Sequence, residues 1–251
     1  MELSALAGNA HVKAVLSQQE GGRGLSHAYI LSGPAGLGRH TLARLLCGAM
    51  LCADSSGERP CGHCAPCRKV SSGVHPDVTV ISGPGEGKPI TVDQVRALRD
   101  EAVYTPAAVR KRVYIVDEVH MLSTPAFNAL LKILEEPPAH LMFILATTEL
   151  HKVPATILSR CQRFDFRRIS AESIVSRLGA ICVSEDVEFE GEALDLIAHR
   201  AEGGMRNALT SLEQLIAFGE GKVTLEVAER MLGGVDTSDV AEIVRAVGTR
   251  D

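Results

Sequence analysis

A run of glycines near the start of the chain has the spacing of a loop that binds phosphate groups. Residues 33–41 read Gly-Pro-Ala-Gly-Leu-Gly-Arg-His-Thr. Gly33, Gly36 and Gly38 occupy the places at which the backbone N–H groups of such a loop curl around phosphate oxygens. The pattern G-x-x-x-x-G-K-[ST] also needs a lysine that reaches the terminal phosphates and a hydroxyl that holds Mg²⁺. The glycines therefore predict the frame of a phosphate loop.

The two side chains that do the chemistry of a phosphate loop are replaced. Arg39 stands at the lysine position, where its guanidinium keeps the positive charge but is a wide planar fork. His40 stands at the hydroxyl position and lacks the hard oxygen ligand that Mg²⁺ prefers. Thr41 follows one residue later, about 100° further around a helix. Binding of ATP and Mg²⁺ stays open, but we do not expect a competent ATPase. A glycine-rich turn unrelated to nucleotide is the alternative.

An acidic pair follows an apolar run further along the chain. Residues 113–116 predict a buried strand that delivers Asp117 and Glu118 at its carboxyl end, where the ligands of open α/β sheets bind. In an active ATPase the Asp would help to hold Mg²⁺, and the Glu would orient or deprotonate the attacking water. A solvated acidic pair is the alternative, but the phosphate loop upstream favours a site.

Three more side chains suit the phosphate tail of a nucleotide. Thr148 follows a strand predicted at 141–146, a position suited to sensing the terminal phosphate. Arg160 could enter a neighbouring subunit's nucleotide site as an arginine finger, although a surface arginine in an ion pair is the alternative. Arg206 opens a predicted helix and could reach back to a phosphate.

Four of the seven cysteines form a cluster with the spacing of a metal site. They are Cys52, Cys61, Cys64 and Cys67. Four thiolates with two overlapping C-x-x-C turns predict a closed, structural Zn²⁺ site. An iron–sulfur cluster can use similar spacing, but glycine- and proline-rich turns favour zinc. The other three cysteines lie on apolar stretches, where we expect buried free thiols.

The elements that must position these residues alternate between strands and helices. The apolar pattern predicts strands at 27–32, 78–81, 113–116 and 141–146, and helices at 3–19, 41–51, 91–102 and 125–134. This order indicates an α/β fold, a parallel sheet with helices on both faces. After Phe166 the pattern predicts helices alone, at 171–183, 190–201, 205–218 and 224–232. We expect a nucleotide-binding-fold domain at 1–166 with the cysteine insert at 52–67, and a helical domain at 167–234. A further helical segment begins at 235–251.

The composition excludes several classes of protein. The hydrophobic fraction of 45% and the charged fraction of 23% are those of a soluble globular protein. No apolar run reaches the ~20 residues needed to span a bilayer, and the N-terminus lacks the pattern of a signal peptide. We therefore expect a cytoplasmic protein with no membrane partner. The net charge of −5 argues against a chain that coats nucleic acid through its overall charge.

Together these motifs resemble the AAA+ subunits of the bacterial DNA polymerase III clamp loader, from about residue 5 to about residue 240. The stretches that carry the resemblance, besides the loop and the cysteine insert, are 117–123, 128–132, 134–138 and 157–161. The altered loop and the segments 75–77 and 91–96 look like the delta-prime subunit. The segments 117–123 and 204–209 look like gamma/tau. The substitutions at Arg39 and His40 favour delta-prime.

The resemblance implies a RecA-like P-loop domain, a small all-α lid and the start of a helical collar at 235–251. It implies a part in DNA replication, in loading the sliding clamp onto primed DNA together with the other clamp-loader subunits. In the delta-prime interpretation the chain does not hydrolyse ATP and supplies Arg160 to a neighbour. One rival is an active gamma/tau ATPase in which Arg39 and Thr41 replace the usual pair. A second rival is a zinc-dependent DNA-binding module.

Overall fold

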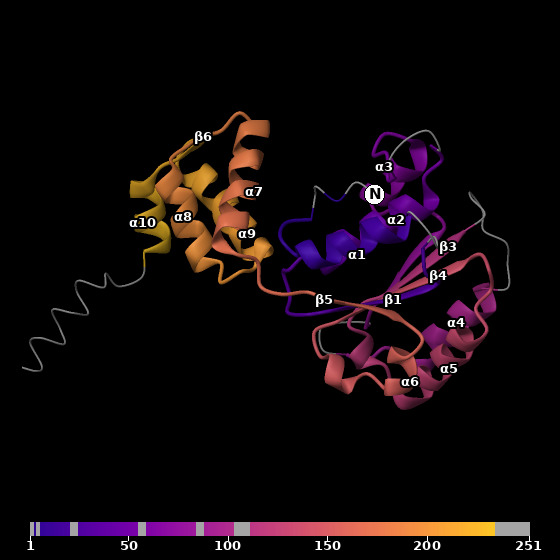
Figure 1. The fold of residues 1–251 in the computed structure, drawn as a ribbon. Helices are drawn as coiled ribbons and strands as arrows, with labels where there is room; N and C mark the ends of the chain where they lie inside the picture. The colour runs from indigo at the N-terminus through magenta and orange to yellow at the C-terminus, as the bar shows by residue number, and fades with distance from the viewer. Residues whose placement is uncertain are drawn as a thin grey trace, which may run out of the picture. The chain divides into compact units, whose positions relative to one another are not determined.

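The computed structural model describes residues 3, 6–20, 25–54, 59–83, 88–102 and 111–233 (Figure 1). The chain divides into two compact units, Met1–Arg167 and Arg168–Asp251, which are considered separately below. The segment 235–251, where a collar was predicted to begin, lies outside the described residues. Among the residues described, no helix is long and apolar enough to cross a membrane.

The first unit is built on a parallel sheet whose strand order is β2-β3-β4-β1-β5. The strands are β1 (Ala28–Ser32), β2 (Val78–Ile81), β3 (Arg112–Val116), β4 (Leu141–Thr147) and β5 (Gln162–Asp165). Every residue of β1 and of β4 is buried. A continuous apolar run is what a parallel strand covered on both faces requires, so the predicted α/β fold is confirmed.

Helices cover both faces of the sheet (Figure 1). They are α1 (Ala10–Glu20), α2 (Arg39–Leu51), α3 (Ala65–Ser71), α4 (Val92–Ala102), α5 (Thr124–Glu135) and α6 (Ala155–Leu158). Two short 3-10 helices, η1 (Val119–Met121) and η2 (Leu150–Lys152), follow β3 and β4. Because parallel strands need crossover connections, each strand end leads into a helix or a turn at one edge of the sheet.

Each face of the sheet has its own hydrophobic core, because successive strand residues point to opposite sides. Met142 and Ile144 of β4 belong to the core beneath α1 and α2, while Phe143 belongs to the core beneath α4 and α5. A stacked aromatic pair lies in each: Tyr29 with Phe164 at 5.9 Å between ring centroids, and Tyr114 with Phe143 at 5.6 Å. The two cores fix the sheet, and hence the loops at its carboxyl edge.

Three local expectations differ from the structure. The helix predicted over 3–19 begins only at Ala10, because Gly8 and Asn9 have φ of 61° and 48° and interrupt any earlier turn. Strand β5 was not predicted, since only Phe164 of its four residues is buried and the run gives no apolar signal. Helix α3, which begins in the cysteine insert and contains Cys67, was not predicted, because the C-x-x-C spacing indicates turns there.

The second unit is a small helical lid. It contains α7 (Ala171–Ser184), α8 (Gly191–Arg200), α9 (Met205–Phe218) and α10 (Leu225–Leu232). Ser170 and Thr224 cap α7 and α10 by accepting backbone N–H bonds with their side chains. The expectation of helices alone was wrong in one detail. A two-residue parallel pair, β6 (Glu188–Phe189) with β7 (Lys222–Val223), joins two of the connections.

Candidate functional site

The phosphate loop lies between β1 and α2, in the setting that its sequence predicts. Gly33, Gly36 and Gly38 have φ of 143°, 80° and 97°, a region that L side chains rarely adopt. Space also excludes side chains there. A Cβ on Gly33 would lie 2.7 Å from the carbonyl oxygen of Phe166, and one on Gly38 would lie 2.7 Å from Leu6 Cδ1. The loop opens onto the N-terminus of α2, where unpaired N–H groups favour an anion.

Arg39, the first residue of α2, is only 5% exposed. Its Nη2 donates to Glu118 Oε1 at 2.9 Å. Its Nη1 is buried and has no hydrogen-bond partner within the described part of the chain. Burying an unpaired guanidinium N–H costs free energy. An acceptor that bound Nη1 would recover this free energy.

His40 contacts the other member of the acidic pair. Its Nε2 lies 3.3 Å from Asp117 Oδ1, with the imidazole about half exposed. The bond to His40 lowers the pKa of Asp117, and it outweighs burial, which alone would raise that pKa. In a working loop this carboxylate and a hydroxyl at position 40 would share Mg²⁺. Here an imidazole occupies the hydroxyl position and binds the carboxylate, so the side chains present do not fit that ion.

Glu118 is held from two sides at the end of β3. Thr148 donates its backbone N–H and its hydroxyl to Glu118 Oε2 at 2.8 and 3.0 Å, opposite the bond from Arg39. Partial burial would raise the pKa of Glu118, but the bonds from Arg39 and Thr148 lower it. The backbone of Glu118 is left-handed, with φ of 47°, which is unusual for a residue with a Cβ. A carboxylate bound in this way is not free to receive a proton from water.

Three more residues complete this network: Thr147, which with Thr148 supplies the two hydroxyls expected at the strand end, and His120 and Glu149, which were not predicted to belong to the site. His120 Nδ1 lies 3.0 Å from Thr147 Oγ1 and 3.3 Å from Glu118 Oε2, and its Nε2 lies 3.0 Å from Glu149 Oε2. The imidazole is almost completely buried, 7% exposed. Its position two residues after the acidic pair was the available signal. A turn that begins at the end of β3 returns this side chain to the end of β4.

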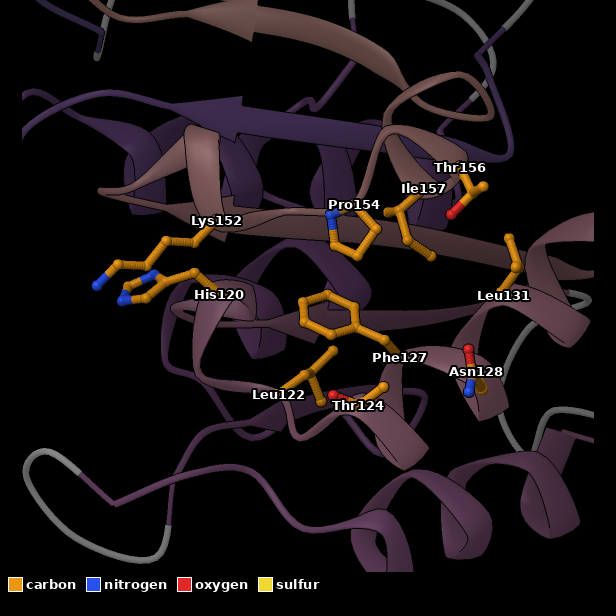
Figure 2. Close-up of a pocket in the computed structure, with 10 residues that line it drawn as sticks. All are labelled: His120, Leu122, Thr124, Phe127, Asn128, Leu131, Lys152, Pro154, Thr156 and Ile157. Carbon is orange, nitrogen blue, oxygen red and sulfur yellow. The ribbon is translucent and has the colours of Figure 1, made fainter.

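A groove opens beside His120, between α5 and the segment from η2 to α6 (Figure 2). Its volume is about 330 Å³. Figure 2 shows Phe127 and Pro154 on its walls, with His120 and Lys152 together at one end. His120 thus belongs both to this groove and to the polar network around Glu118.

The other predicted site residues lie apart from this network. Arg160 donates to Glu135 Oε1 at 2.9 Å and to the carbonyl oxygen of Thr156 at 2.8 Å, and its side chain is 34% exposed. It lies just after α6 and contacts the end of α5, not the phosphate loop. Thr41 is half-buried on α2 with no described side-chain bond. Arg206 is exposed in the first turn of α9, within the lid.

The four clustered cysteines come together as the spacing predicts. All four sulfur atoms lie within 4.8 Å of one another. The Sγ atoms of Cys52 and Cys64 are 4.0 Å apart, as are those of Cys61 and Cys67. A tetrahedral ion with metal–sulfur bonds of about 2.3 Å requires sulfurs about 3.8 Å apart. The donor set and its spacing therefore fit a four-coordinate Zn²⁺.

The insert packs directly against α2. A Cβ on Gly48 would lie 2.9 Å from Pro60 Cβ, so the absence of a side chain there permits the contact. Cys67 Sγ lies 3.9 Å from the carbonyl oxygen of Gly48. The three cysteines outside the cluster were predicted to be buried, and Cys47 and Cys182 are, while Cys161 is half-buried.

Two family models match the chain. The model described as "DNA polymerase III, delta subunit" matches residues 8–170. The model described as "DNA polymerase III clamp loader subunit, ATPase lid domain" matches residues 173–221. The first match covers most of the first unit and extends over residues 168–170 of the second. The second match lies wholly within the lid.

Curated relatives are similar over nearly all of this chain. DNA polymerase III subunit tau of Bacillus subtilis is 42% identical over 96% of the chain, which is 42% of that protein. Subunit tau of Escherichia coli is 40% identical over 96% of the chain and 37% of its own length. Subunit gamma/tau of Mycobacterium bovis is 38% identical over 98% of the chain and 43% of its own length. The chain thus spans about two fifths of the length of these relatives.

Solved structures agree on the fold. The Thermotoga maritima RuvB Holliday junction branch migration motor superposes with a TM-score of 0.63 over 91% of this chain and 70% of that one, at 21% identity. A point mutant of the same protein gives the same values. At this identity the likeness shows the AAA+ fold alone.

Proposed function

This chain belongs to the family of DNA polymerase III clamp-loader subunits, and on that premise we propose that it helps to load the sliding clamp onto primed DNA. It would act within an assembly of such subunits, in the cytoplasm, with the clamp and the primer–template as the other partners. In this proposal the chain does not hydrolyse ATP. Its contribution is a positive charge delivered to the nucleotide of a neighbouring subunit.

The observation that carries this proposal is the pairing of the acidic residues with the substituted loop residues. Hydrolysis needs Asp117 free for Mg²⁺ and Glu118 free for water. Here His40 binds the first and Arg39 binds the second. Arg39 and His40 are the residues that depart from the phosphate-loop pattern. Their presence removes the usual lysine and hydroxyl, and their side chains also bind the two carboxylates that hydrolysis would need.

Arg160 is the residue we propose to act on a neighbour. A guanidinium placed against the terminal phosphates stabilises the charge that develops in phosphoryl transfer. To do so Arg160 must leave Glu135, to which it is bound at 2.9 Å. The pair is partly exposed, with side chains 34% and 45% accessible, and such pairs are worth little. Breaking it is therefore a small obstacle to forming a subunit interface.

The test compares two variants in the assembled clamp loader. Arg160→Ala should slow its DNA-stimulated ATP hydrolysis at least about tenfold. Glu135→Gln, which frees Arg160 without removing it, should leave the rate unchanged or raise it. Equal rates for wild type and Arg160→Ala would refute the arginine-finger role. Equal losses in both variants would show a merely structural role for the pair.

A second candidate is a chain that hydrolyses ATP itself. The relatives named above are tau and gamma subunits, and this favours gamma/tau over the delta-prime subunit suggested by the altered loop. Thr148 and Glu118 also stand at the places that an active site would use. Turnover by the purified chain that is abolished by Glu118→Gln would establish this alternative, and no turnover above background would support the first proposal.

We further propose that the cysteine cluster holds one structural Zn²⁺. Its four thiolates close the coordination sphere and leave no position for a substrate. The ion would fix the insert on α2, through the contact of Gly48 with Pro60, and would take no part in hydrolysis.

A further inference from the structure

We propose that Arg39 and His40 replace the divalent cation at the phosphate loop, so that this chain binds a nucleoside diphosphate without Mg²⁺. The inference rests on the proposed function only in taking the loop as a nucleotide site. It concerns what the loop binds and under which ionic conditions, and it stands whether or not Arg160 acts on a neighbour.

Two carboxylates at the end of β3 would repel the phosphate tail of a nucleotide, and in an active P-loop protein Mg²⁺ offsets that repulsion. In this chain Arg39 lies 2.9 Å from Glu118 and His40 lies 3.3 Å from Asp117. Each carboxylate therefore has a basic partner from the loop itself. The charge of Glu118, which the metal would normally offset, is therefore offset by Arg39.

Mg²⁺ binds hard oxygen donors in near-ideal octahedral geometry. The hydroxyl that would be one of them is absent at position 40, and the carboxylate of Asp117 already contacts the imidazole that replaces it. A cation entering here would have to displace His40 and would gain one ligand fewer than usual. The donor set therefore disfavours Mg²⁺ while it leaves the anion site intact.

Arg39 leaves one of its donors unused within the described part of the chain. Its side chain is 4% exposed, and Nη1 has no partner among the described residues while Nη2 donates to Glu118. Arginine has a fork of N–H donors, so one side can hold a carboxylate while the other receives a phosphate oxygen. The backbone N–H groups at the start of α2 supply the remaining donors. We infer that these donors can hold an anion without any metal.

The same side chains favour a diphosphate over a triphosphate. The third phosphate of ATP adds negative charge that the lysine and Mg²⁺ of an active loop jointly hold. Here one guanidinium is shared with Glu118, and this carboxylate is fixed in place by two bonds from Thr148. A third phosphate would therefore lack both the metal and the unshared cation that hold it in an active loop. ADP should therefore bind at least as tightly as ATP.

The experiment is a calorimetric titration of the purified chain with ADP and with ATP, each in EDTA and in Mg²⁺. For the wild type we expect the Kd for ADP to change by less than about threefold between EDTA and Mg²⁺. A tightening of tenfold or more on adding Mg²⁺ would overturn the proposal, and so would the absence of ADP binding. ATP binding more than about tenfold tighter than ADP in EDTA would overturn the diphosphate preference.

A designed variant reverses the two substitutions. The double change Arg39→Lys with His40→Thr restores the usual loop, and its ADP affinity should rise at least about tenfold on adding Mg²⁺. The matched control is Arg44→Lys with His151→Thr. Arg44 is exposed on the same helix, and the His151 side chain is 76% exposed. The control should behave as the wild type, and a control that gains Mg²⁺ dependence would refute the assignment to Arg39 and His40.

Thermal melting of each variant separates a failure to fold from a failure to bind. If the restored loop does not fold, the single variant His40→Thr carries the same test, since it returns only the hydroxyl. The outcome is independent of the arginine finger. Strict Mg²⁺ dependence of ADP binding by the wild type would refute this inference and leave the Arg160 test unaffected. An unchanged ATP hydrolysis rate in the Arg160→Ala complex would refute the arginine finger and leave this inference unaffected.

Discussion

Arg39 and Glu118 form an ion pair that links the first turn of α2 to the end of β3, with 2.9 Å between Nη2 and Oε1. The arginine side chain is 4% exposed and the carboxylate 32%. An ion pair with one member buried differs from a surface pair, because removing the carboxylate or the cation leaves a partner that water cannot fully solvate. This pair therefore contributes to the stability of the fold as well as to the state of the site.

Replacing Arg39 with methionine should destabilise the chain. The change leaves Glu118 without its cation and should lower the free energy of unfolding by about 2 kcal/mol, measured by urea denaturation. The matched control is Arg96→Met on α4. Arg96 pairs with Asp93 at 3.4 Å, with side chains 58% and 85% exposed, and its loss should cost less than about 0.5 kcal/mol. Equal losses in the two variants would contradict a special role for the buried pair.

The acidic pair should also make stability depend on pH. The pKa values of Asp117 and Glu118 are lowered in the folded chain, from ordinary values of 3.8 and 4.5. A group whose folded pKa lies below its unfolded value stabilises the fold above the unfolded pKa, and this contribution is lost as pH falls through the folded value. The melting temperature of the wild type should therefore fall as pH is lowered from about 5 to about 3.

The variant Asp117→Asn with Glu118→Gln tests this origin. Its melting temperature should fall less steeply over the same acidic range, because neither amide titrates. Asp93→Asn serves as the control, since the Asp93 side chain is 85% exposed. A double variant whose acid dependence matches that of the wild type would show that other carboxylates dominate.

The cysteine cluster should bind about one zinc ion per chain, measured by elemental analysis of the purified protein. Cys61→Ser and Cys64→Ser should each remove the ion, and a chelator should lower the melting temperature of the wild type. Cys161→Ser is the control, because Cys161 lies outside the cluster and should keep the full zinc content. Iron in place of zinc, with a visible absorbance band, would support the iron–sulfur alternative.

The sheet and the phosphate loop could be predicted because their signals are local. The glycines at 33, 36 and 38 and the apolar runs of β1, β3 and β4 depend only on neighbouring residues. The cysteine spacing is likewise local. Strand β5 was missed because it lies at the edge of the sheet with one buried residue, and its partner β1 is more than a hundred residues earlier. Pairing at that separation has no sequence period.

The contents of the site were harder to foresee than its frame. The residue types at positions 39 and 40 predicted the loss of the lysine and of the hydroxyl ligand for Mg²⁺. They did not predict that Arg39 and His40 would bind Glu118 and Asp117. His120 was missed for a similar reason. Its partners Thr147 and Glu149 come from the end of β4, and only the parallel register of β3 with β4 brings the two strand ends together.

Packing of the insert on α2 predicts opposite effects for two glycine substitutions. Alanine in a helix interior normally stabilises by about 1 kcal/mol over glycine. Gly179→Ala in α7 should show this gain, because its nearest side-chain atoms are 3.8 Å away. Gly48→Ala should instead cost about 1–3 kcal/mol, since the new Cβ would lie 2.9 Å from Pro60. Similar gains at both positions would show that the insert moves freely away from α2.

His120 should contribute to stability through the network that it completes. Its imidazole contacts Thr147, Glu118 and Glu149 and is 7% exposed. His120→Ala leaves these partners with fewer bonds in a partly buried place and should lower the free energy of unfolding by about 1–3 kcal/mol. His151→Ala is the matched control, because that imidazole lies 3.9 Å from the same Glu149 but is 76% exposed. If both variants unfold at the same urea concentration, burial of His120 does not matter. A larger loss for His120→Ala would show that the ends of β3 and β4 are held together by this side chain.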